Sequence, residues 1–188
     1  MTDDDLVVRA RSDRTAFGAL YDRYYPRVMR YCLRRLFVRQ VAEDVASDAF
    51  LHVASHLPGF EGTTETDFRC WLYRIVSNAV NAYLRQTRRR QELCESAARS
   101  GHLHTRNDMP TIEHLDWPAV YQAVLELDPR DQTILTLRYY ADLPHDEIAA
   151  IVGIKPGAVR TAVCRILDRL RGRFGVDKGV TALNEGQP

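Results

Sequence analysis

The side chains best suited to bind a polyanion follow a tight turn in the C-terminal part of this 188-residue chain. Ala149 precedes Gly153 by four residues. This is the spacing of a helix-turn-helix, in which a small residue lets two helices cross closely and a glycine takes the left-handed backbone conformation of the turn. The second helix then carries donors suited to phosphates and to base edges in the major groove. These candidate contacts are Lys155, Arg160, Thr161 and Arg165.

A second set of basic side chains is mixed with aromatic and amide residues earlier in the chain. Arginine can contact a nucleic-acid backbone while aromatic rings stack on unpaired bases, so this mixture predicts binding to melted DNA. Phe60 lies in the glycine-containing loop 57–64 and is expected to be exposed, whereas Trp71 is as compatible with a core position. The candidate residues are Phe60, Arg69, Trp71, Arg74, Ser77, Asn78, Asn81 and Arg85.

The distribution of charge supports two separate contacts with a polyanion. The chain has 26 Lys and Arg against 25 Asp and Glu, a net charge of +1. Residues 68–90 nevertheless carry +6 and residues 155–173 carry +5, while residues 115–154 carry −5. A solvated helix face explains one basic segment, but two of them on periodic helices favour nucleic-acid binding.

Catalytic and metal chemistry find little support in the sequence. There is no glycine-rich phosphate loop and no nucleophile paired with a base. The cysteines form no CxxC pair and are interpreted as reduced thiols. His52 and His56 lie four residues apart but lack the frame of a metal-binding motif, and a zinc site in the segment with Cys94, His102, His104 and His114 is a minor alternative. We therefore expect no catalytic residue, metal or cofactor.

The elements that must position these residues are all predicted to be helices. Apolar spacings of three and four predict helical structure over 15–37, with Pro26 as a kink or a helix start, and over 41–57, whose opposite face is acidic. Asp67 is expected to cap a helix over 68–88. Further helices are expected over 118–127, 130–140, 144–152 and 155–174.

The sequence thus predicts an all-α protein of two small helical domains joined by a flexible linker. We expect the first domain to span 1–90, the linker 91–114, the helix-turn-helix domain 115–174 and a flexible tail 175–188. No apolar run approaches the roughly 18 to 20 residues of a membrane helix. The acidic start has no secretory signal, so a cytoplasmic protein without membrane insertion is expected.

The order of these features resembles the extracytoplasmic-function sigma factors, the small two-domain specificity subunits of bacterial RNA polymerase. The resemblance covers about residues 13–173. It rests on Phe17–Val28, on Ala42–Leu51, on Phe68–Ile75 followed by Asn78, and on Leu127–Arg130 with Leu137–Tyr139 and the helix-turn-helix. The chain departs from the usual family residues at Ser47, Ala54, Ser77 and Ala162.

The resemblance implies a transcription initiation factor without catalytic activity of its own. It implies that Lys155, Arg160, Thr161 and Arg165 read a minus-35 element, and that the set from Phe60 to Arg85 reads and helps to melt a minus-10 element, with the loop 57–67 capturing a flipped base. The implied partners are core RNA polymerase (beta-prime and beta subunits), promoter DNA and an anti-sigma protein, with no small-molecule substrate. The implied polymerase contacts are Asp44, Ser47, Asp48 and Phe50.

The sequence leaves two other interpretations open. A stand-alone helix-turn-helix regulator would dimerise and carry a sensor pocket in its first domain, but the basic helix 68–90 argues against it. An ordinary helical hairpin would explain the Ala149–Gly153 spacing, but not the row of donors on the second helix.

Overall fold

The computed structural model describes residues 3–99 and 118–174, with only the backbone described for 91–99 and 118–121. Within these ranges the chain is helical and contains no strand, which confirms the all-α prediction. The N-terminal unit comprises α1 (Asp3–Ala10), α2 (Arg14–Leu36), α3 (Arg39–His56), the 3₁₀ turn η1 (Leu57–Gly59) and α4 (Glu65–Arg99). The C-terminal unit comprises α5 (Pro118–Leu125), α6 (Pro129–Tyr139), α7 (His145–Val152) and α8 (Pro156–Phe174).

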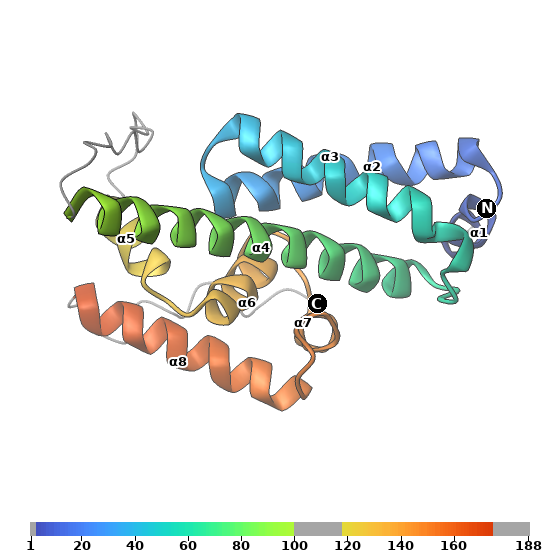
Figure 1. Cartoon of the computed structure of the whole chain (residues 1–188). Helices are drawn as coiled ribbons and strands as arrows, with labels where there is room; N and C mark the ends of the chain where they lie inside the picture. Colours follow the sequence, from blue (N-terminus) through green and yellow to red (C-terminus); the bar gives the residue numbers. More distant parts are fainter. Residues whose placement is uncertain (1–2, 100–117, 175–188) are drawn as a thin grey trace.

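The long helix α4 separates the two units. In Figure 1, α2 and α3 lie along one side of α4, and α6, α7 and α8 lie along the other. Rings of α2 pack against rings of α4, with centroids 5.4 Å apart for Tyr24 and Phe68 and 5.8 Å apart for Tyr31 and Tyr73. Burial of large aromatic side chains is a principal source of stability in a unit of this size. The apolar side of α4 therefore forms one side of the N-terminal core.

Three helix boundaries differ from the sequence prediction. Residues 14–36 form one helix with Pro26 inside it, where the sequence allowed a helix pair. Helix α4 begins at Glu65 and continues through Arg99, so the first nine residues of the expected linker are helical. Helix α1 was not predicted, because it is only eight residues long and begins with three aspartates. Its Leu6, Val7 and Ala10 are nevertheless buried.

A reciprocal pair of hydrogen bonds starts α4. The backbone N–H of Asp67 donates to the Thr64 hydroxyl at 3.1 Å, and the Asp67 carboxylate accepts from the N–H groups of Thr63 and Thr64. This is a capping box with Thr64 as the N-cap, so Asp67 does not cap a helix beginning at Phe68 as predicted, but lies within the first turn. The hydrogen bonds from Thr64 hold the pKa of Asp67 below its usual value.

The helix-turn-helix forms around the glycine identified in the sequence. Gly153 has φ +75°, and its N–H donates to the carbonyl oxygen of Ala149 at 2.8 Å. Ile148 of α7 and Val159 of α8 are fully buried where the two helices face each other. The left-handed turn was predictable because it requires a residue without a Cβ at one defined position.

Candidate nucleic-acid interface

The outer face of α8 carries the predicted major-groove donors. Lys155, Arg160 and Thr161 are exposed, as the helical period predicted. Arg165 is exposed too, but its guanidinium donates to both carboxylate oxygens of Asp131 on α6, at 2.9 and 3.0 Å. Lys155 and Arg160 therefore offer exposed positive charge on this face, whereas Arg165 must exchange Asp131 for any other anion.

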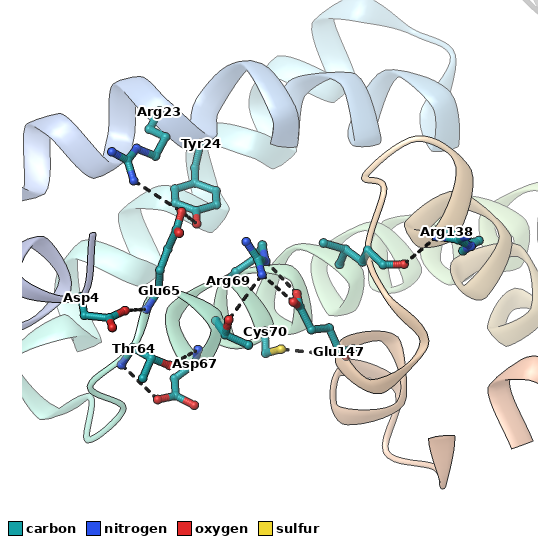
Figure 2. A network of polar contacts seen from close by, with 12 residues as sticks. Asp4, Arg23, Tyr24, Thr64, Glu65, Asp67, Arg69, Cys70, Arg138 and Glu147 are labelled. Carbon is teal, nitrogen blue, oxygen red and sulfur yellow. Dashed lines mark hydrogen bonds and ion pairs between the residues drawn. The ribbon is translucent and has the colours of Figure 1, made fainter. Parts of the chain in front are cut away.

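The polar side of α4 faces the C-terminal unit. Figure 2 shows Arg69 and Cys70 pointing toward Glu147 of α7. The Arg69 Nε donates to Glu147 at 2.7 Å, and a second bond joins the same two side chains. Side chains of Arg69 and Glu147 are only 21% and 9% exposed. Arg74 donates to the carbonyl oxygen of Ala150 at the end of α7. Two of the predicted DNA contacts are thus occupied by the chain itself.

A second polar cluster joins the two units farther along α4. The buried guanidinium of Arg35 donates to Gln132 of α6 and, at 2.7 Å, to Asn81 of α4. Asn81 in turn donates to Thr133 of α6 at 3.4 Å. Because Arg35 is buried among neutral partners, its pKa is lowered. Arg35 and Gln132 were missed by sequence reasoning, since each stands alone in a helix without a motif.

Between these clusters lies a cleft lined by α4, α6 and α7. Asn78 is exposed and lines it with Asn81, while Arg130 contributes a positive charge from the first turn of α6. Arg85 lies farther along α4 and is exposed. The rest of the lining is Ser77, Asp128, Pro129, Thr133, Ile151 and Val152.

Ser77 belongs to the core and not to the exposed stripe. It is 4% exposed, and its hydroxyl is 3.0 Å from the hydroxyl of Tyr31. The prediction placed Ser77 beside Asn78 on the DNA-facing side. One helical position, a rotation of about 100°, separates the buried residue from the exposed one.

The loop before α4 packs on that helix through Phe60. Phe60 is half-buried and stacks on Trp71 with ring centroids 4.7 Å apart. A Cβ on Gly62 would collide with the Phe60 ring and with Asp67, so this position requires glycine. Phe60 was expected to be exposed and is only partly so, because the ring finds an aromatic partner on α4.

The acidic face of α3 is exposed where the sequence indicated. Asp44, Ser47 and Asp48 point to solvent. Phe50, predicted to contact a partner, is instead 3% exposed and packs on Tyr21 with ring centroids 4.8 Å apart. The neighbouring Leu51, which sequence reasoning missed, is 68% exposed. Its i+3 spacing from Asp48 places it on the same face.

The cysteine and histidine side chains are the groups that could act as nucleophiles or metal ligands. Burial and the charge of Glu147 raise the pKa of the Cys70 thiol to about 11. The rings of His52 and His56 stack on α3 with centroids 4.0 Å apart. No group of three or more metal-ligating side chains gathers within the described residues. The side chains of the minor alternative zinc site, Cys94, His102, His104 and His114, lie outside the described residues.

Within residues 3–99 and 118–174, no helix combines the length and apolar character needed to span a membrane.

Comparison with known sequences gives two separate family matches. Residues 20–90 match Sigma-70 region 2, and residues 118–170 match Sigma-70 region 4. The chain is 30% identical over 194 residues to the ECF RNA polymerase sigma-E factor of Escherichia coli, covering 97% of this chain and 96% of that protein. It is 32% identical over 168 residues to the ECF RNA polymerase sigma factor BldN of Streptomyces coelicolor, covering 88% of this chain and 63% of BldN.

Two solved structures share the fold. CnrH in complex with the cytosolic domain of CnrY aligns with a TM-score of 0.68 and 21% identity, over 93% of this chain and 98% of that one. The sigma factor RpoE of Bartonella quintana in complex with the anti-sigma factor NepR aligns with a TM-score of 0.62 and 20% identity, over 86% and 98%. These two structures therefore share with this chain the arrangement of the helices, in addition to the two regions matched by sequence.

Proposed function

Since the chain belongs to the extracytoplasmic-function class of the sigma-70 family of RNA polymerase sigma factors, we propose that α8 and α4 read the two elements of one bacterial promoter. The protein is a transcription initiation factor that directs core RNA polymerase to specific promoters. Two separate faces carry hydrogen-bond donors, one on α4 in the region 2 match and one on α8 in the region 4 match. This observation supports assigning one promoter element to each helix.

The minus-35 element is the proposed target of α8. Lys155, Arg160 and Thr161 are exposed behind the Gly153 turn, so they can enter the major groove together. Arg165 lies one turn farther along and joins the contact by leaving Asp131 for a phosphate. Charge-assisted contacts of this kind give affinity, and side-chain donors to base edges give sequence preference.

The minus-10 element is the proposed target of α4 and the loop before it. Arg69, Arg74, Asn78, Asn81 and Arg85 supply donors along one side of the helix, and Phe60 with Trp71 supplies a ring surface. Unpairing and unstacking a base cost a few kcal/mol, which stacking on aromatic rings and contacts with arginine can offset. Ser77 is left out of this set because it pairs with Tyr31 in the core.

Core RNA polymerase is the proposed partner of α3. Asp44, Ser47 and Asp48 form a polar face. The sequence implied Phe50 as the apolar contact on this face, and we assign that contact to exposed Leu51 instead. An apolar side chain surrounded by polar ones suits a protein interface, where the apolar contact is shielded from water. We infer that this face docks on the polymerase, which supplies all the catalytic chemistry, in the bacterial cytoplasm.

The contacts between α4 and the C-terminal unit favour an inhibited form of the free protein. Arg69 is largely covered by Glu147 of α7, so DNA can reach it fully only after the two units separate, whereas exposed Arg74 must exchange its hydrogen bond to the Ala150 carbonyl oxygen. The two similar solved structures contain CnrY and NepR, and we propose that this chain too is held closed by an anti-sigma protein.

Run-off transcription tests the proposed function directly. Purified core polymerase is combined with a genomic fragment library, with and without this protein, and the start sites are mapped. We expect discrete new starts that share two upstream elements. Arg160→Ala should weaken use of starts through the upstream element and Asn78→Ala through the downstream one. The absence of new starts, together with no binding to core polymerase, would refute the proposal.

A further inference from the structure

The short helix α1 contacts the start of α4, and Arg11, just after α1, contacts the loop that precedes α4. This loop, residues 60–64, presents exposed Glu61 and Thr63 and ends at the capping box. Its inner side rests on the stacked rings of Phe60 and Trp71. The loop is thus an exposed turn that packs on two stacked aromatic side chains. It lies next to the hydrogen-bond donors of α4.

Two aspartates of α1 hold the beginning of α4. The Asp4 carboxylate accepts a hydrogen bond from the backbone N–H of Glu65 at 2.7 Å, and Asp3 lies 2.8 Å from the guanidinium of Arg23. Arg23 and the Tyr24 hydroxyl both contact the Glu65 carboxylate, the latter at 2.7 Å. Figure 2 shows Asp4 reaching the Glu65 backbone from one side and the α2 side chains reaching its carboxylate from the other. The first turn of α4 is therefore fixed to two other helices.

Arg11, just after α1, holds the loop itself. Its guanidinium donates a hydrogen bond to the carbonyl oxygen of Gly62 and lies over the Phe60 ring, 5.9 Å from the centroid. The Nε of Arg11 is buried and has no hydrogen-bond partner among the described residues. Burying a polar atom in this way costs free energy, so the contacts with the loop must offset it.

We propose that Arg11, assisted by Asp4, is a positioning residue that sets the conformation of loop 60–64 for selective recognition of one unpaired promoter base. This inference rests on the proposed function, because it assigns a cause to the selectivity of the minus-10 contact. Arg11 is turned toward Gly62 and Phe60, so it acts through the loop and not by touching the base. Holding a recognition loop in one conformation before binding raises discrimination, since a mobile loop adapts to several bases.

The test measures base selectivity of the polymerase holoenzyme. Core polymerase is loaded with the wild-type protein, Arg11→Ala, Arg11→Lys or the control Arg14→Ala, whose target is an exposed arginine at the start of α2. Fork-junction templates are built from a promoter mapped by run-off transcription, and each carries one of the four bases at each unpaired minus-10 position. Affinity for every template, affinity for core polymerase and the thermal unfolding midpoint are measured for each variant.

We expect Arg11→Ala to lower the preference for the best base over the next one by about tenfold, the effect of losing one hydrogen bond from a charged group. Arg11→Lys, which can still donate to Gly62, should recover part of that preference. Arg14→Ala should behave as wild type, and all variants should bind core polymerase equally.

A purely structural role for Arg11 would give a different pattern. Equal loss of affinity on all four bases, or a wild-type preference in Arg11→Ala, would overturn the inference while leaving the proposed function intact. If the wild-type holoenzyme itself shows no base preference at any unpaired position, both are overturned.

Discussion

Adjacent residues on α4 face different surroundings because a helix turns by about 100° per residue. Ser77 points into the core and pairs with Tyr31, while Asn78 points into the cleft between the two units. Arg69, eight positions before Ser77, is turned toward α7. The chemistry of each side chain therefore depends on its helical phase as much as on its type.

Substitutions at this adjacent pair separate folding from recognition. Ser77→Ala should lower the free energy of unfolding by about 1 kcal/mol, because the buried Tyr31 hydroxyl loses a hydrogen-bond partner. It should leave the set of transcription starts unchanged. Asn78→Ala should keep the stability within about 0.5 kcal/mol and lose use of the downstream promoter element. Urea unfolding and run-off mapping measure the two effects, and altered starts in a stable Ser77→Ala protein would contradict this assignment.

At the scale of elements, α3 shows how one helix serves the core and a partner at once. Its buried side, with Val45, Ala49 and Val53, packs on the rest of the N-terminal unit. Phe50 joins this side by packing on Tyr21 and Tyr25. The opposite side is acidic around exposed Leu51, so the change from core to interface occurs between two consecutive residues.

Leu51 and Phe50 should respond oppositely to truncation. Leu51→Ala should leave stability unchanged and weaken binding to core polymerase about tenfold, in keeping with the roughly 1.5 to 3 kcal/mol gained by burying a leucine. Phe50→Ala should lower the free energy of unfolding by about 3 to 5 kcal/mol, because it leaves a cavity beside the rings of Tyr21 and Tyr25. Titration of core polymerase with fluorescently labelled protein measures the first effect, and wild-type affinity of Leu51→Ala would argue against the α3 interface.

At the scale of the whole molecule, the first arginine of α4 is paired with the acidic part of the C-terminal unit, while Arg74 and Arg85 stay exposed. The segment 115–154, which carries a charge of −5, supplies Glu147 to Arg69 across 78 positions of sequence. The cluster of Arg35, Asn81 and Gln132 adds hydrogen bonds from a guanidinium to two side-chain amides at the same boundary. Promoter DNA must therefore compete with the chain's own carboxylate for α4.

Glu147→Gln should open the free protein. The substitution removes the charge that Arg69 binds, and leaving one partner of a buried ion pair without the other is strongly unfavourable. Cys70 reports the change, because its thiol donates to the Glu147 carbonyl oxygen at 3.9 Å and its pKa is raised to about 11. Opening exposes the thiol and lowers its pKa toward the ordinary value of 9.0, so alkylation should become about tenfold faster at a fixed mildly alkaline pH.

The control for this change is Asp146→Asn, which removes a charge from the exposed neighbouring residue. Peptide mass spectrometry follows Cys70, with exposed Cys164 as the internal reference. Glu147→Gln should also bind a single-stranded minus-10 oligonucleotide more tightly than wild type. Equal alkylation rates in wild type and Glu147→Gln would show that this ion pair does not hold the units together.

The features that the sequence alone determined are those that depend on local repeats. The helical period located α3, α4 and α6 to α8, and the Ala149–Gly153 spacing located the turn, because a left-handed backbone next to a close crossing admits few residue types. The same period put Lys155, Arg160 and Asp48 on exposed faces. Charge counted by segment identified the basic helices and the acidic stretch between them.

Only the tertiary structure decided which residues at the edge of a face are buried and which distant charges meet. The period places Phe50 and Ser77 near a boundary, and the neighbouring helices then supply the partners that bury them. Phe60 lies in a loop without any period, and Trp71 of α4 supplies its partner. The pairs Arg69–Glu147 and Arg11–Gly62 join segments whose separation along the chain carries no local signal. Such contacts follow from how whole helices dock, since each helix can pack in several ways that satisfy its own apolar face.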